Sequence, residues 1–139
     1  MLGQRDPAVY GPATLADIQE LVSHRAQELG TIVAFFQSNS EGAIIDYLQA
    51  QASSANGIVI NPGALTHYGL SLRDALVDTG LPVVEVHISN IYARERWRRR
   101  SVVAAISVGQ ISGLGWRGYL AALDTLVALI NEPEAPKGA

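Results

Sequence analysis

Two charged residues of one predicted strand have the types and the spacing needed for acid–base chemistry. Glu85 and His87 lie two residues apart in the run Val83 to Ile88, so both side chains point to the same face of the strand. A carboxylate beside a histidine fixes the tautomer of the ring and favours the imidazolium, as a general acid requires. The alternative is a buried ion pair with a structural role. Because burying charge is costly, the pattern favours catalysis.

A second polar group follows another apolar run. Asn61 comes directly after Ile58-Val59-Ile60, and one tight loop joins it to His67. An amide and an imidazole in such a loop are suited to contact a ligand, and we expect them to do so. The alternative is a turn in which the Asn61 side chain caps backbone groups.

Half of the ten basic residues lie in one short segment. They are Arg94, Arg96, Arg98, Arg99 and Arg100. A nucleic-acid surface is one interpretation, but the net charge is -3 and only Trp97 interleaves as an aromatic. An arginine that binds a carboxylate, or arginines at a subunit interface, explains the segment with fewer assumptions. Arg5 and Tyr10 lie in a Gly- and Pro-flanked loop, where position alone indicates solvent exposure.

The composition limits the class of protein. A chain of 139 residues with 48% apolar and 17% charged residues suits one folded domain. The absence of cysteine excludes disulfides and thiolate metal sites. Dinucleotide, triphosphate, zinc-protease and serine-hydrolase motifs are also missing from the sequence. There is neither an apolar signal at the N-terminus nor a bilayer-spanning run, so we expect a cytoplasmic protein without membrane or nucleic-acid partners.

Helices and strands are expected to alternate along the chain. Helices are predicted from Thr14 to Gly30, after Ser40, over 70–77, and from about 116 to 130. Strands are predicted over 31–36, 58–60, 83–88 and within 102–111. The alternation predicts one α/β domain over 1–131, with a parallel sheet covered by helices on both faces and a flexible tail over 132–139. Ligands of such sheets bind beyond the carboxyl ends of the strands, where Asn61 and His87 lie.

Five segments together resemble one family, the type II dehydroquinases. They are LGQRDPAVYG (2–11), QSNSEG (37–42), INPGALTH (60–67), EVHISN (85–90) and GQISGLGWRGYLAAL (109–123). The likeness is ordered, keeps the spacing between segments and runs over nearly the whole chain. It implies a flavodoxin-like three-layer sandwich that removes water from 3-dehydroquinate, giving 3-dehydroshikimate through an enolate, without a metal or other cofactor.

The resemblance also implies a role for each site residue. Tyr10 would be the general base that takes a proton from the carbon next to the ketone, with Arg5 stabilising its phenolate. His87 would be the general acid, with Glu85 behind it, and Asn61 would hold a water or the oxyanion of the enolate. The substrate would also be contacted by His67, Asp74, the Ile88-Ser89 backbone and Arg98. Residues 1–13 would form a lid.

Three features depart from the family pattern. Ser40 and Arg100 replace common histidines. The chain also opens in the loop that follows the first apolar strand of the family, so we expect the sheet to lack that strand. The family assembles as a dodecamer, a tetramer of trimers, and we expect a role in the shikimate pathway towards chorismate and the aromatic amino acids. The same reaction in quinate breakdown, a truncated inactive homologue, and another flavodoxin-like protein such as a receiver or an FMN carrier are the alternatives.

Overall fold

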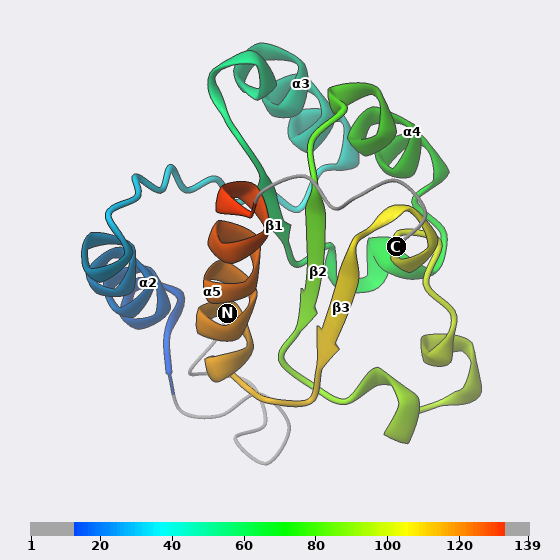
Figure 1. Ribbon diagram of the computed structural model, residues 1–139. Coiled ribbons are helices and arrows are strands. Elements are labelled where there is room, and N and C mark those ends of the chain that lie inside the picture. The colour runs from blue at the N-terminus through cyan, green and yellow to red at the C-terminus, as the bar shows by residue number, and fades with distance from the viewer. Residues whose placement is uncertain (1–12, 133–139) are drawn as a thin grey trace, which may run out of the picture.

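The sheet of this protein is parallel throughout its described part. The structure is a computed structural model that describes residues 13–132. Its three strands are β1 (Ile58–Ile60), β2 (Val83–His87) and β3 (Gly109–Ser112), in the spatial order β1-β2-β3 (Figure 1). The strands predicted at 58–60 and 83–88 are confirmed. The last predicted strand also exists, although it lies at the end of the expected range.

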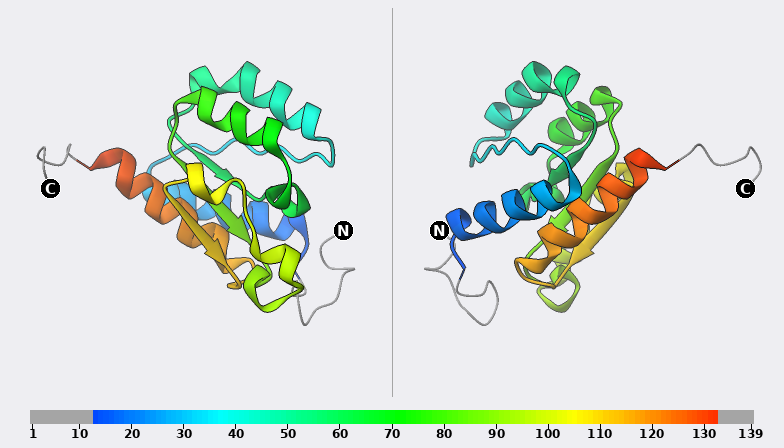
Figure 2. Two further views of the ribbon diagram at one scale, coloured as in Figure 1. Left: turned by 90° about the vertical axis from the view of Figure 1, so that its right-hand side faces the viewer. Right: turned by 60° about the vertical axis from the view of Figure 1, so that its left-hand side comes forward.

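Helices cover both faces of this sheet. They are α2 (Leu15–Leu29), α3 (Glu41–Gln51), α4 (Leu70–Thr79) and α5 (Arg117–Asn131). In Figure 2, α3 and α4 form the layer on one side of the strands, and α2 and α5 form the layer on the other side. Short 3-10 turns lie between these elements in the described residues: η1 (Ala52–Ser54), η2 (Gly63–His67), η3 (Ile91–Ala93), η4 (Arg96–Arg99) and η5 (Ala104–Ile106). The predicted three-layer sandwich with a flavodoxin-like arrangement is confirmed.

The ends of α2 illustrate how local sequence sets the helix bounds. The Thr14 hydroxyl accepts from the backbone N–H of Asp17 at 3.1 Å, and the Asp17 carboxylate accepts from the Thr14 N–H at 3.0 Å. This capping box satisfies two N–H groups that the first turn leaves without helical partners. Gly30 ends the helix in the left-handed conformation, with φ of 69°. The predicted start and end of this helix are confirmed.

Strand β2 divides its side chains between the two layers. Val84 and Val86 pack with Ala122 and Leu126 of α5. Val83 faces the opposite layer, where it joins the cluster formed by α3 and α4. Because side chains alternate along a strand, Glu85 and His87 follow Val83 onto this second face, beyond the apolar cluster.

The predicted strand over 31–36 is wrong, because the chain between α2 and α3 pairs with none of the described strands. Its β-branched and aromatic residues favour an extended backbone, but a strand exists only where a neighbour supplies hydrogen-bond partners. In the absence of pairing, Ile32 is 97% exposed and Phe36 stacks on Tyr47 of α3 with ring centroids 4.2 Å apart.

Some predictions fall on parts of the chain that the structure does not describe. The lid over 1–13 and the tail over 132–139 lie outside the described residues, apart from Ala13 and Glu132. None of the helices between residues 13 and 132 is long and apolar enough to cross a membrane.

Candidate active site

Glu85 and His87 form a buried pair at the carboxyl end of β2. His87 Nε2 lies 2.5 Å from Glu85 Oε2. The His87 side chain is 5% exposed and the Glu85 side chain is 0% exposed. The predicted placement of both side chains on one face of the strand is confirmed. Since Nε2 faces the carboxylate, Nδ1 is the ring nitrogen that a bound molecule would meet.

Three other segments donate hydrogen bonds to the Glu85 carboxylate. Thr66 Oγ1 of η2 donates to Oε2 at 2.6 Å, and Gln110 Nε2 of β3 donates to Oε2 at 2.9 Å. Ser101 Oγ donates to Oε1 at 2.7 Å and accepts from the backbone N–H of Ala104 at 2.9 Å. The carboxylate therefore joins β2 and β3 to the loops that follow β1 and β2.

These contacts determine the charge of Glu85. Burial is the largest single influence and would raise the pKa of its carboxyl group. Hydrogen bonds from His87, Thr66, Gln110 and Ser101 act in the opposite direction and together outweigh burial, so the pKa lies below its ordinary value. Glu85 is therefore a carboxylate near neutral pH, and it presents a negative charge to the His87 ring.

Asn61 follows β1 and is held at both ends of its amide. Its Oδ1 accepts from the backbone N–H of Gly63 at 3.0 Å, and its Nδ2 donates to the Tyr119 hydroxyl of α5 at 2.7 Å. Burial raises the pKa of Tyr119 despite the hydrogen bond from Asn61, so the hydroxyl is neutral near pH 7. The predicted alternative, in which Asn61 caps a backbone group of the turn, is confirmed by the Gly63 contact. This contact fixes the side chain at the carboxyl end of the strands, where His87 also lies.

The arginine-rich loop brings His67 and Arg98 to one aromatic side chain. The His67 and Trp97 rings meet edge to face with centroids 5.0 Å apart, and the Arg98 guanidinium lies 4.2 Å from the Trp97 ring centroid. His67 Nδ1 is also 2.6 Å from the carbonyl oxygen of Arg100. Arg98 Nε donates to Glu95 Oε2 at 2.5 Å. The arginine expected to bind a substrate carboxylate is thus already paired with a carboxylate of the chain.

Ile88 and Ser89 continue β2 into this loop and are both buried. Their carbonyl oxygens accept from Gly115 N at 3.1 Å and from Ser112 Oγ at 3.1 Å. The Ser89 hydroxyl lies 3.4 Å from Arg94 Nη1. The turn between β3 and α5 therefore fixes the backbone directly after His87.

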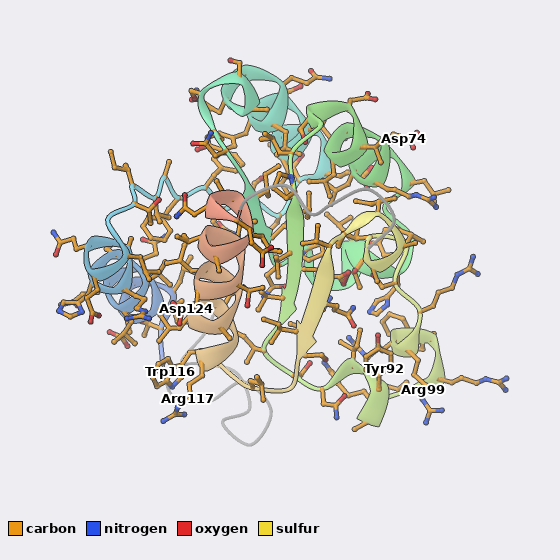
Figure 3. The ribbon with its side chains drawn as sticks, in the orientation of Figure 1. Asp74, Tyr92, Arg99, Trp116, Arg117 and Asp124 are labelled. Carbon is orange, nitrogen blue, oxygen red and sulfur yellow. The ribbon has the colours of Figure 1, made fainter. Side chains whose placement is uncertain are left out.

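The remaining predicted site residues do not join this cluster within the described chain. Asp74 is exposed on α4, and Figure 3 shows it away from Tyr92 and Arg99, which lie on the arginine-rich loop. Arg5 and Tyr10 lie outside the described residues.

Four residues of the cluster escaped the sequence interpretation as site residues. Thr66, Ser101 and Gln110 bind the Glu85 carboxylate, and Tyr119 binds Asn61. Gln110 could have been found from the sheet, because it is the register partner of Glu85. Thr66 of η2 and Ser101 belong to the segments between the strands and the larger helices, whose approach to β2 has no periodic signal in the sequence.

Within residues 13–132, no group of three or more His, Asp or Glu side chains is arranged to hold a metal ion. A surface hollow over α2 is lined by Asp17, Glu20, Leu21 and His24. Among the described residues, the lining of this hollow comes from α2, whereas the polar cluster lies at the strand ends. We place the candidate site at the cluster because its buried charges and hydrogen bonds converge there.

Fold and site together define a parallel α/β protein with a buried Glu–His pair at the carboxyl ends of its strands. The family model of dehydroquinase class II matches residues 1–127. The 3-dehydroquinate dehydratase of Herpetosiphon aurantiacus is 57% identical over 127 residues, which cover 91% of this chain and 88% of that protein. A catabolic 3-dehydroquinase of Neosartorya fischeri is 48% identical over 132 residues, covering 95% and 88%.

A solved structure agrees with these sequence relatives. The type II dehydroquinase of Propionibacterium acnes superposes with a TM-score of 0.87 at 42% identity, covering 91% of this chain and 88% of that chain. The chain therefore belongs to the class II dehydroquinase family, as the five sequence segments predicted.

Proposed function

We propose that this protein is a hydro-lyase that removes water from 3-dehydroquinate to give 3-dehydroshikimate. The observation that carries the proposal is the buried Glu85–His87 pair, with 2.5 Å between Oε2 and Nε2, in a chain that matches the family over residues 1–127. The relative from Herpetosiphon aurantiacus bears the name of this activity.

The elimination needs one base and one acid. Tyr10, as a phenolate stabilised by Arg5, takes the proton from the carbon next to the ketone, and the electrons move into an enolate. The enolate then reforms the ketone as the carbon–oxygen bond to the hydroxyl breaks, and His87 gives the departing hydroxyl its proton. Water leaves and a conjugated enone remains. The roles of Tyr10 and Arg5 rest on the family resemblance of residues 2–11.

The geometry around His87 supports its role as the acid. Glu85 holds Nε2, so the transferred proton leaves from Nδ1. The low pKa of Glu85 keeps that carboxyl ionised, and the negative charge stabilises the imidazolium before transfer. Proton transfer by a positioned side chain contributes roughly 10² to 10⁴ in rate.

The other roles concern binding. Arg98 holds the substrate carboxylate, aided by the amide groups of Ile88 and Ser89, and His67 contacts a substrate hydroxyl. Asn61 donates to the enolate oxygen, directly or through a water, with the second N–H of its Nδ2, while the first N–H stays on the Tyr119 hydroxyl. Asp74 is exposed on α4 in this chain, so its contact with the substrate rests on the resemblance alone.

Pathway and assembly are part of the same proposal. We assign the reaction to the shikimate pathway, with quinate breakdown as the second candidate because one relative is a catabolic 3-dehydroquinase. We further propose a cytoplasmic dodecamer built from trimers that needs no cofactor and has no nucleic-acid or membrane partner.

An absorbance assay tests the reaction. On addition of 3-dehydroquinate, the conjugated enone should appear, and His87→Ala should lower kcat by about 10²-fold or more while substrate still binds. His24→Ala is the matched control, because His24 is exposed on α2 with 76% of its side chain accessible. Failure of the wild-type protein to form the enone would refute the proposed activity.

A further inference from the structure

Tyr92 and Gln110 form a hydrogen-bonded chain that reaches Glu85 from the surface. Gln110 lies opposite Glu85 in the parallel register of β2 and β3, so both side chains leave the same face of the sheet. Gln110 Nε2 donates to Glu85 Oε2 at 2.9 Å, and the Tyr92 hydroxyl donates to Gln110 Oε1 at 2.5 Å. Tyr92 belongs to η3, on the segment that continues to Arg99 (Figure 3).

The chemistry of the three groups fixes the direction of this chain. An ionised carboxylate only accepts hydrogen bonds, so the amide nitrogen of Gln110 must face Glu85. The amide oxygen then faces Tyr92, whose hydroxyl must donate. Reversing the amide would place its oxygen against the carboxylate, so Glu85 selects the orientation of the amide, and the Tyr92 hydroxyl holds the outer end of the Gln110 side chain in place.

Exposure shows that the chain connects two environments. Tyr92 is 47% exposed and Glu85 is 0% exposed. Tyr92 lies between the His87 strand and η4, the turn that carries Trp97 and Arg98. A change in the position of this loop therefore moves a group that is linked through two hydrogen bonds to the partner of His87.

We propose that Gln110 and Tyr92 are positioning residues for His87. Gln110 orients the Glu85 carboxylate towards His87 Nε2, and Tyr92 ties Gln110 to the arginine-rich loop, so that the placement of this loop governs the state of the acid. The inference rests on the proposed function, in which His87 is that acid.

The surroundings of the carboxylate make the effect measurable. The groups that contact it are His87 of its own strand, Thr66 of η2, Ser101 before η5 and Gln110 of β3. Among these contacts in the described chain, the His87 ring is the one ionisable side chain. Donation by Gln110 lowers the pKa of Glu85. Removal of that donor therefore makes the carboxylate take up a proton at higher pH.

Two variants separate the links of the chain. Gln110→Met keeps the length of the side chain and removes both of its hydrogen bonds. Tyr92→Phe removes only the hydrogen bond from Tyr92 to Gln110. It changes an exposed residue, so it tests the proposal even if Gln110→Met fails to fold. Tyr68→Phe is the matched control, because Tyr68 is 64% exposed and belongs to the turn after η2 rather than to this chain.

The experiment follows the histidine rings directly. The protein contains three histidines, so labelling with ¹⁵N-histidine gives three rings, and the exposed His24 is an internal reference. For Gln110→Met we expect the acid-side titration step of the Glu85–His87 pair to move up by about 0.5 to 1 pH unit. We also expect kcat to fall roughly tenfold, with KM within about twofold. Tyr92→Phe should cause a smaller change in the same direction, and Tyr68→Phe none.

An unchanged His87 spectrum and titration step in a folded Gln110→Met or Tyr92→Phe protein would overturn the inference, even if the variant melted earlier. Such a result would mean that the substituted residue supports only the fold and does not position His87. The nuclear magnetic resonance measurement needs no turnover. Failure of this inference is therefore distinguishable from failure of the proposed activity, because the latter would appear as a wild-type protein that forms no enone.

Discussion

Glu85 is a fully buried charge, and its position makes sense only with its hydrogen-bond partners. An unpaired carboxylate at such a site costs several kcal/mol. Here Thr66, Ser101 and Gln110 donate to it together with His87. A glutamate at this buried strand position therefore needs hydrogen-bond donors from two loops and from the neighbouring strand. This arrangement serves a residue that must keep its charge beside a proton donor.

The charge of Glu85 links stability to pH. Its pKa in the folded protein lies below its ordinary value, so the ionised form stabilises the fold above the unfolded pKa of about 4.3. This stabilisation disappears as the pH falls through the folded pKa. We expect the melting temperature of the wild-type protein to drop from about pH 5 downwards. Glu85→Gln should melt earlier at neutral pH and lose less on acidification.

Thermal melts across this pH range measure the effect, with Glu20→Gln as a control on the exposed surface of α2. Parallel wild-type and Glu85→Gln curves would show that Glu85 does not carry the acid dependence.

Arg98 provides a test of binding at a single residue. It is paired with Glu95, which is 58% exposed, and an exposed pair contributes about 0 to 1 kcal/mol. Substrate should therefore displace Glu95 at little cost. We expect Arg98→Ala to raise KM by roughly 30-fold or more, as loss of a buried charge contact would. Glu95→Gln should lower KM by no more than about fivefold.

Arg99→Ala is the matched control, since Arg99 is an exposed neighbour on the same turn (Figure 3). Initial rates over a range of substrate concentrations give these constants. A normal KM for Arg98→Ala would transfer the role to another arginine, Arg94 being the next to examine.

At the scale of elements, the strongest sequence predictions were those with local causes. The capping box at Thr14, the stop at Gly30 and the apolar run at Ile58 each determine an element through neighbouring residues. The segment 31–36 has the composition of a strand and still does not pair, because pairing depends on a distant neighbour. The hydroxyl donors to Glu85 were missed for the same reason: Thr66 and Ser101 reach it through loop geometry.

The turn from β3 to α5 holds the end of the His87 strand. Gly113 N donates to the carbonyl of His87 at 3.2 Å, and Gly115 N donates to that of Ile88 at 3.1 Å. Both glycines have positive φ, 87° and 61°, so alanine at either position is strained by about 1 kcal/mol. A Cβ on Gly113 would also lie 2.9 Å from Asn90 Cβ, whereas one on Gly115 meets nothing within 4 Å.

We therefore expect Gly113→Ala to cost about 1 to 3 kcal/mol more than Gly115→Ala and to lower kcat, because His87 moves with its carbonyl. Denaturant unfolding and the enone assay measure the two effects. Equal stability of the two variants would mean that Asn90 moves aside without strain.

At the scale of the whole molecule, the proposed reaction uses only proton transfer by side chains and involves neither a metal ion nor an imine. Lys137 is the only lysine of the sequence and the only amine side chain able to form an imine with a ketone. We expect turnover to survive both treatment with EDTA and treatment with borohydride in the presence of substrate. A loss of activity in either treatment, measured against untreated enzyme, would contradict an enolate mechanism run by tyrosine and histidine.

The exposed surface of α4 offers a test of the proposed assembly. Leu70 and Val77 lie seven residues apart on α4, so they share one face of the helix, and they are 59% and 53% exposed. Asp74 lies between them on the same face and is also exposed. Large apolar side chains grouped in this way are typical of surfaces that become buried between subunits. We expect a second copy of the chain to cover this face in the proposed dodecamer.

Val77→Asp should then dissociate the assembly, because a charge placed in an apolar interface loses its solvation. Ser71→Asp adds the same charge to an exposed polar position of α4 and should leave the assembly intact. Light scattering coupled to size-exclusion chromatography gives the mass of each form, and thermal melts show that both variants are folded. A wild-type mass equal to one chain would refute the dodecamer itself. If Val77→Asp keeps the wild-type mass of a dodecamer, the contacts lie elsewhere, and the exposed apolar residues Val108 and Leu114 become the next positions to charge.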